Sequence, residues 1–502
     1  MGKASKAWAV GGILVAVVAA SACRGRTTTP SDAGRGSQVT GVVVDSQADI
    51  GTFDGVRFER LVGHVEGQVH RTENVAGLAE ILGEADHHTY RSAFEVIRPV
   101  EGSDRQLMVV EVENRGSPIM LQLFNRFTIG FSGAPDETRY PAGVGDGFLF
   151  GGGRSYARVQ WETGVSPGVP SSAQGVGEVI VRDFGRLLRA GRIGASPSPL
   201  GRYRTLVFTG TSVSAWFINT FLAEGFNAGP GGRRVYDGAL VLAGSGNWLA
   251  INQLGNDGGA QQPYVRPNGR PRRASEILTR PASDPFVVDV VTYTEFYRMR
   301  AALSRDPDPP ERTRQYEVPA PKAPVALFDE AFVFGRLGCN DQTVIPLNPL
   351  DYRPYLRALL IGLEGELGGT GRSLPPSTRF RLGPEPPPSR YFNDLPGGDV
   401  AVPELDGDGQ PVGGVRFPEA DLPLGRPEPP AVPPVITTTN VCGNFGGYQP
   451  FSAAELERRY GSSSAYEQRV QPLVDRLVGQ GWLLPGDRQW VIDDLRRRFE
   501  AA

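Results

Sequence analysis

One serine flanked by small residues is the feature of this sequence that most suggests chemistry. Residues 210–214 read GTSVS, so a glycine precedes Ser212 by two positions, while Ser214 stands where a second glycine is usual. A serine hydroxyl is a weak nucleophile unless a neighbouring base takes its proton. Histidine is the usual base, but no histidine follows Ser212. All four histidines of the chain lie before residue 89: His64, His70, His87 and His88.

The elements around Ser212 are those that would expose such a serine. Residues 203–209 (YRTLVFT) predict a short apolar strand, and residues 213–224 carry apolar side chains at helical spacing until Gly225 ends the helix. A sharp turn between a strand and a helix is a nucleophile elbow, in which the Val213 amide would help to bind an oxyanion. An ordinary strand–helix connection has the same local pattern, so both interpretations stay open at this point.

The wider pattern alternates predicted strands with predicted helices. This alternation predicts an alpha/beta fold with a mainly parallel central sheet and helices on both faces. We find neither an internal repeat nor a Ser/Gly linker, and therefore expect one large domain with insertions. The predicted strands are 107–112, 156–161, 203–209, 239–243 and 286–292, and the predicted helices include 179–189 and 213–224.

Several separated segments carry a more specific signal. Besides the elbow they include ENRG at 113–116, GDGFL at 145–149, FLAEGFN at 221–227, RRVYDG at 233–238, TEFY at 294–297, NPLDYRP at 348–354 and PPSTRF at 375–380. Together they resemble a bacterial family of large alpha/beta-hydrolase-domain proteins whose substrates are mostly unassigned. The resemblance implies an alpha/beta-hydrolase fold over roughly residues 40–502.

The resemblance also implies roles for individual residues. Ser212 matches the family's nucleophile, and Glu295 stands where the acid that orients the histidine is expected. A glutamate that is only solvated or salt-bridged would look the same in the sequence. The oxyanion donors would be the amide of Val213 and an amide near Trp161 to Glu162. The family's histidine aligns with Ala323, which is not a base.

Two other sources of a base deserve weight. Lys322 lies one residue before Ala323, and serine–lysine pairs work where burial lowers the lysine pKa. Three nearby prolines, Pro319, Pro321 and Pro324, favour an exposed extended loop instead. The early histidines could supply a recruited base or a metal site, but their spacing matches no established ligand pattern. We therefore expect no metal and no cofactor.

The sequence thus supports two functional hypotheses. The first is a hydrolase-fold protein that is catalytically impaired because it lacks the histidine, and that acts as a binding or envelope component. The alternative is an active serine carboxylic-ester hydrolase that uses Ser212 with an unconventional base. Either would take a small-molecule ligand or ester substrate whose identity the sequence does not give.

The first residues predict export and a lipid anchor. Lys3 and Lys6 precede an apolar stretch, and Ala20-Ser21-Ala22 then leads to Cys23. This pattern is typical of a bacterial lipoprotein signal over residues 1–22, with Cys23 lipidated and the protein held on a membrane outside the cytoplasm. Arg24 favours the outer membrane. An ordinary secretory signal with a coincidental cysteine is the alternative. Residues 24–38 are poor in apolar side chains and predict a flexible tether before a domain of residues 39–502.

Charge and cysteine content limit the remaining possibilities. The formal charge is −3 and becomes −5 when the signal with its two lysines is removed, which predicts no nucleic-acid binding. Cys339 and Cys442 are the other two cysteines, and outside the cytoplasm we expect them to form a disulfide, with two buried free thiols as the alternative. The proline- and glycine-rich residues 374–434 predict an extended strap over the domain, and residues 451–500 predict C-terminal helices.

Overall fold

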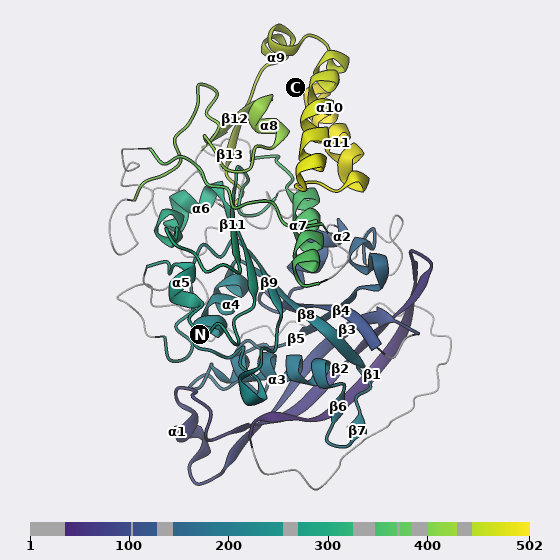
Figure 1. The fold of residues 1–502 in the computed structure, drawn as a ribbon, viewed down its shortest axis with the longest axis vertical. Coiled ribbons are helices and arrows are strands. Elements are labelled where there is room, and N and C mark those ends of the chain that lie inside the picture. Colours follow the sequence, from purple (N-terminus) through teal and green to yellow (C-terminus); the bar gives the residue numbers. More distant parts are fainter. Residues whose placement is uncertain are drawn as a thin grey trace, which may run out of the picture.

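A large twisted sheet forms the centre of the protein (Figure 1). The computed structural model describes residues 36–101, 104–127, 144–254, 270–324, 347–368, 372–383, 400–428 and 444–502. Within them the sheet has nine strands, in the spatial order β1 (Gln38–Phe53), β2 (Val56–His70), β3 (His87–Pro99), β5 (Ser155–Val159), β4 (Asp104–Val112), β8 (Arg202–Thr211), β9 (Gly238–Leu242), β10 (Phe286–Thr292) and β11 (Thr313–Val318).

The direction of the strands agrees with the predicted fold class. From β5 to β11 every neighbouring pair in the described sheet is parallel, whereas β1, β2, β3 and β5 pair antiparallel. The alpha/beta fold with a mainly parallel sheet is therefore confirmed. The long antiparallel strands β1 to β3 were not among the predicted elements.

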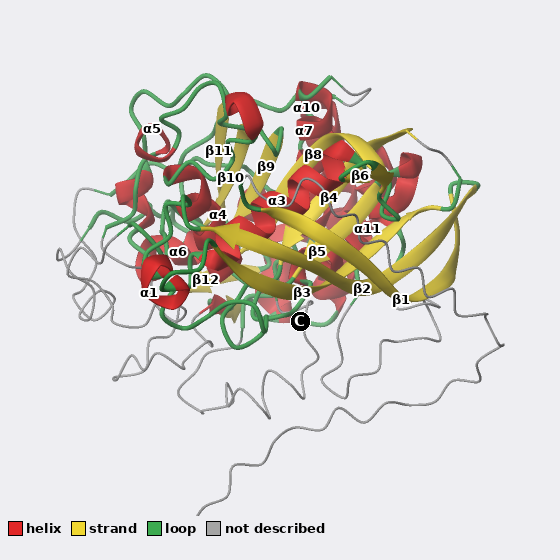
Figure 2. Cartoon of the chain, turned by 90° about the horizontal axis from the view of Figure 1, so that it is seen from below, coloured by secondary structure: helices red, strands yellow, loops and turns green. Residues whose placement is uncertain are grey.

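The parallel strands form because their residues are apolar on both faces. In β4 and β8, Val110 and Phe208 face one hydrophobic core, while their neighbours Val109 and Val207 face another. The first core is closed by α3 (Val176–Ala190) and α4 (Val213–Ala223). The second is closed by α2 (Ile119–Asn125), α7 (Arg353–Glu366), α10 (Ser463–Gln480) and α11 (Arg488–Glu500). The sheet is thus covered on both faces, as Figure 2 shows from below.

Shorter elements complete the described fold. They are the helices α1 (Leu78–Leu82), α5 (Ala274–Ile277), α6 (Tyr293–Arg298), α8 (Pro418–Asp421) and α9 (Ala453–Tyr460), the small hairpin β6 (Arg192–Ile193) with β7 (Ser196–Pro197), and the pair β12 (Gly425–Glu428) with β13 (Gly447–Pro450).

The described part of the proline-rich region lies along the last strand of the sheet. The Thr378 amide donates to the Gln315 carbonyl at 3.1 Å, and the Glu317 amide donates to the Thr378 carbonyl at 3.1 Å. Further along the chain, the Val415 amide donates to the Glu317 carbonyl. These bonds satisfy backbone groups of β11 that an edge strand would otherwise expose.

Several predictions about the termini and cysteines concern residues that the structure does not describe. The signal segment 1–22, Cys23, Cys339 and Cys442 lie outside the described residues. β1 begins at Gln38, so the last residue of the expected tether belongs to the sheet. Among the described residues, no helix combines the length and the apolar character needed to cross a bilayer.

Candidate active site

Ser212 occupies a strained turn at the carboxyl end of β8. Its backbone has φ 57° and ψ −121°, an uncommon conformation for a residue with a side chain. Two backbone bonds hold the turn: the Ser212 amide donates to the Leu242 carbonyl at 3.1 Å, and the Trp216 amide donates to the Ser212 carbonyl at 3.0 Å. Gly210 is required here, because a Cβ at that position would lie 2.9 Å from the Cβ of Ser214. The turn therefore has the conformation that a nucleophile elbow needs.

The elbow is supported by the loop that follows β4. The side-chain amide of Asn114 donates to the Thr211 carbonyl at 3.0 Å, which fixes this loop against the residue before Ser212. Val213 is the first residue of α4, so its amide has no helical acceptor and can donate to an oxyanion. Trp161 packs behind the loop, since its indole N–H donates to the Glu113 carbonyl at 3.0 Å. The loop of Asn114 thus lies against both the elbow and Trp161, and the second oxyanion donor near Trp161 to Glu162 stays a prediction.

Glu295 lies in the first turn of α6, directly after β10. Its carboxylate is fully buried, and Oε2 accepts hydrogen bonds from the Thr292 amide at 2.9 Å and from the Thr292 hydroxyl at 3.1 Å. This is a capping box, which gives the residue a structural role. Burial raises the pKa of Glu295, and the nearby ammonium group of Lys322 opposes that rise. Glu295 therefore caps a helix and also interacts electrostatically with Lys322.

Lys322 follows β11, and the structure corrects the expectation that it lies on an exposed loop. The residue is only 5 % exposed. Its amide donates to the Thr294 hydroxyl at 2.9 Å, and its carbonyl accepts from the Tyr352 hydroxyl at 2.9 Å. The expectation was wrong because the extended segment around Pro319 and Pro321 packs between the start of α6 and the start of α7 and is itself buried.

The surroundings of the Lys322 amine change its acidity. Nζ lies 4.9 Å from the centroid of the Trp216 ring, one helical turn after Ser212. Burial lowers the pKa of Lys322 to about 8; the carboxylate of Glu295 opposes this shift, and the charge of Arg298 adds to it. An amine with this pKa is partly neutral in mildly alkaline solution and can accept a proton.

The three residues share one edge of the sheet. Ser212, Glu295 and Lys322 follow the carboxyl ends of β8, β10 and β11, and these strands are parallel. Adjacent strands lie about 4.8 Å apart, so β10 and β11 are roughly 10 and 14 Å from β8. Lys322 reaches toward the elbow through its side chain, because its amine contacts the ring of Trp216 on α4. The structure thus brings the predicted nucleophile, the predicted acid and the alternative base to the same region.

The four histidines belong to another part of the sheet. β3 and β2 lie three and four strands from β8 in the sheet order, or about 14 and 19 Å. Three histidines form side-chain hydrogen bonds in this region of β2 and β3: His64 with Asp45, His70 with Thr72, and His88 with the Gly168 carbonyl. Among the described residues, no cluster of three or more His, Cys, Asp or Glu side chains is arranged to hold a metal.

Sequence reasoning missed four residues that build this site. Thr294 and Tyr352 hold the backbone of Lys322, Trp216 contacts its amine, and Asn114 supports the elbow. Three of them were visible as members of the family-like segments at 113–116, 294–297 and 348–354. Their roles were not visible, because each partner is distant in the sequence.

Comparison with known proteins gives a family and little else. A family model described as "Alpha/beta hydrolase domain" matches residues 150–493. No curated protein matches the sequence. Among solved structures, the esterase Est22 is 12 % identical, with 51 % of this chain and 72 % of that chain covered and a TM-score of 0.24. A glucuronoyl esterase from Teredinibacter turnerae is 11 % identical, with 55 % and 73 % covered and a TM-score of 0.26. Likenesses this weak carry no argument.

Proposed function

Because this chain belongs to the alpha/beta hydrolase domain family, we propose that it is a serine hydrolase of carboxylic esters in which Lys322 replaces the histidine base. The observation that supports this proposal most is the burial of Lys322 beside Glu295 and against Trp216. The sequence favoured an impaired site because no histidine follows Ser212. A buried amine at the end of the last parallel strand is a base of a different kind, and it favours the alternative hypothesis.

Each residue has a defined task in the proposed reaction. Ser212 Oγ attacks the ester carbonyl carbon while its proton passes to Lys322 Nζ. The Val213 amide donates to the negative oxygen of the tetrahedral intermediate. The intermediate collapses, the C–O bond to the alcohol breaks, and Lys322 returns the proton to the leaving oxygen. Water then attacks the acyl-serine by the same route in reverse and releases the carboxylic acid.

The acidity of Lys322 limits this reaction at neutral pH. With a pKa of about 8, only roughly one lysine in ten is unprotonated at pH 7. Glu295 contributes by stabilising the ammonium form that appears after proton transfer. The enzyme should therefore be slow at neutral pH and faster in alkaline solution, which makes a weak neutral activity compatible with a working site.

We further propose that the protein acts on a membrane surface outside the cytoplasm, held by a lipid on Cys23. The support is the order of a positively charged start, an apolar stretch and the small residues Ala20-Ser21-Ala22 before the cysteine.

Hydrolysis of short-chain aryl esters tests the catalytic proposal. The wild-type protein should release the phenol at pH 9 well above the buffer rate, and Ser212→Ala should reduce the rate to background. Ser214→Ala is the matched control, since Ser214 is fully buried in α4. Equal rates in the wild-type and Ser212→Ala proteins would refute the proposal.

A further inference from the structure

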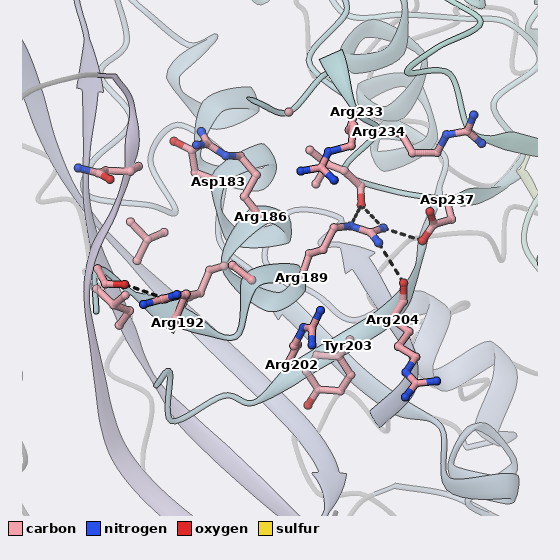
Figure 3. A pocket seen from close by; sticks show the side chains of 18 of the residues that line it. Asp183, Arg186, Arg189, Arg192, Arg202, Tyr203, Arg204, Arg233, Arg234 and Asp237 are labelled. Atoms are coloured by element: carbon pink, nitrogen blue, oxygen red, sulfur yellow. Dashed lines mark hydrogen bonds and ion pairs between the residues drawn. The ribbon is translucent and has the colours of Figure 1, made fainter. Parts of the chain in front are cut away.

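A cavity in the described part of the chain lies at the opposite edge of the sheet from Ser212. It has a volume of about 910 Å³ and opens between the carboxyl end of α3, the first residues of β8 and the loop 229–237 before β9 (Figure 3). Ser212 follows the last residue of β8, whereas Arg202 is its first, so the cavity and the elbow are roughly 30 Å apart along this strand. The cavity is therefore not part of the proposed ester site.

The lining of this cavity is strongly basic although the protein is slightly acidic. Among the described residues that line it, the acidic ones are Asp183 and Asp237, while the chain as a whole has a formal charge of −3. The seven arginines that line it are Arg186, Arg189, Arg192, Arg202, Arg204, Arg233 and Arg234. An excess of arginine over acidic side chains in one cavity raises the local concentration of anions.

Some of these arginines already have protein partners. Arg189 donates to the Val235 carbonyl and the Arg204 carbonyl, and pairs with Asp237 at 2.6 Å. Arg186 pairs with Asp183 at 2.8 Å. The two acids of the cavity are thus engaged by two of the seven guanidinium groups, and these pairs give the wall its shape.

The side chains of two other arginines have no partner among the described residues. The side chains of Arg202 and Arg233 make no hydrogen bond and no ion pair with another residue of the described chain, and both residues are exposed and line the cavity. Figure 3 shows Arg186, Arg189, Arg202 and Arg233 around one space, while Arg204 and Arg234 extend away from it. Arg202 and Arg233 therefore present unneutralised guanidinium groups around a common cavity.

We propose that this cavity binds a multiply charged phosphate group, such as a pyrophosphate or a phospholipid headgroup. A guanidinium group forms paired hydrogen bonds with phosphate oxygens, and several such groups around one cavity require more than one negative charge to balance them. The volume exceeds that of a single inorganic ion, which leaves room for the remainder of a larger molecule.

The position of the cavity relates it to the proposed anchor. Gln38 and Val39, at the start of β1, contribute to its lining, and Arg186 donates to the Ser37 carbonyl at 3.0 Å. The roughly 15 residues between Cys23 and Gln38 can span at most about 50 Å. A lipidated Cys23 would hold this edge of the sheet within that distance of a membrane. The phosphate can therefore belong to a lipid headgroup or to a soluble molecule.

Titration calorimetry with inorganic pyrophosphate tests the site directly. The full chain should bind pyrophosphate saturably, and the double variant Arg202→Gln/Arg233→Gln should bind it at least about 10-fold more weakly. The matched control is Arg458→Gln/Arg497→Gln, which removes the same charge from side chains that are 68 % and 62 % exposed on α9 and α11. The control should bind like the wild type.

Vesicles separate the two sources of phosphate. If the ligand is a headgroup, the wild type should sediment with cardiolipin-containing vesicles more than the double variant does, while vesicles of phosphatidylcholine alone should show no difference. If the ligand is a soluble molecule, the double variant should still bind pyrophosphate more weakly than the wild type, but the two proteins should sediment equally with cardiolipin-containing vesicles. Absence of saturable pyrophosphate binding, or an equal loss in the α9–α11 control, would overturn the proposal. Ester hydrolysis should be unchanged in the double variant, so the two proposals fail independently.

Discussion

The amine of Lys322 lies 4.9 Å from the centroid of the Trp216 ring, one helical turn after Ser212. This contact joins the segment after the last parallel strand to the helix that carries the elbow. Aromatic faces favour the charged form of lysine, whereas burial favours the neutral form. Burial is the larger effect here, because the pKa of Lys322 falls to about 8. The lysine is thus able to exchange a proton in the pH range of the proposed reaction.

Replacing Glu295 should separate its two roles. Glu295→Gln keeps an acceptor for the Thr292 amide but removes the negative charge that favours the ammonium form of Lys322. The pKa of Lys322 should therefore fall further. The pH at which the rate of ester hydrolysis increases should fall with it. Glu295→Ala loses the capping box and should lower the free energy of unfolding by about 1 kcal/mol or more. The control Glu457→Gln, on an exposed face of α9, should change neither quantity. An unmoved pH profile in Glu295→Gln would contradict the electrostatic role.

Glu178 should make the protein less stable as the pH rises. Burial, assisted by the charge of Glu224, raises its pKa well above 4.5, so the folded protein keeps a proton that the unfolded chain releases above pH 4.5. Its stabilising contribution is therefore complete below pH 4.5 and is lost as the pH rises toward the folded-state pKa, by at most about 1.4 kcal/mol per pH unit. Glu178→Gln should gain stability over the wild type between pH 5 and pH 8, measured by urea unfolding. Glu80→Gln, an exposed control on α1, should show no such gain.

How much of the fold the sequence could predict depended on where the interactions lie. The strands 286–292 and 203–209 were predictable because buried β-branched and aromatic runs are local signals, and the turn at Ser212 was predictable from its glycine. The burial of Lys322 was not, since its partners Thr294 and Tyr352 lie 28 and 30 positions away. The prolines that seemed to place the lysine on an exposed loop instead hold an extended buried segment.

The basic cavity was also hidden in the sequence. Arg202 opens β8, while Arg233 belongs to the loop before β9, and only the parallel pairing of the two strands brings them to one edge. Residues 186–204 hold five arginines and no acidic residue, but the sequence does not show that they line one cavity together with Arg233 and Arg234. The missing histidine, by contrast, was plain from the sequence alone. What it means for catalysis depends on the three-dimensional surroundings of Lys322, the proposed replacement base.

The proposed anchor predicts a simple change in partitioning. Wild-type protein expressed in a bacterium should be found with membranes and should incorporate labelled fatty acid, because the thiol of Cys23 carries the lipid. Cys23→Ser should lose both properties. A wild-type protein that is unlabelled and free of membranes would exclude the anchor.

The two remaining cysteines carry a redox prediction. Peptide mapping without reductant should find Cys339 joined to Cys442 in protein taken from outside the cytoplasm. A bond that closes a loop of about 100 residues adds up to about 4.7 kcal/mol in the chain-entropy model, so Cys339→Ser should unfold at lower urea concentration. Recovery of both thiols in alkylated form would defeat this prediction.

The rate at which a fluorophosphonate probe labels Ser212, measured from pH 6 to pH 10, tests the central claim most directly. If Lys322 is the base, the wild-type rate should rise with an apparent pKa of about 8, and Ser212→Ala should not be labelled. In Lys322→Gln, Ser212 should be labelled at least about 100-fold more slowly at pH 9, and the labelling rate should no longer increase with pH. In Lys322→His, the labelling rate should again increase with pH, but over a lower pH range than in the wild type. Equal labelling of the wild-type and Lys322→Gln proteins at every pH would contradict the account.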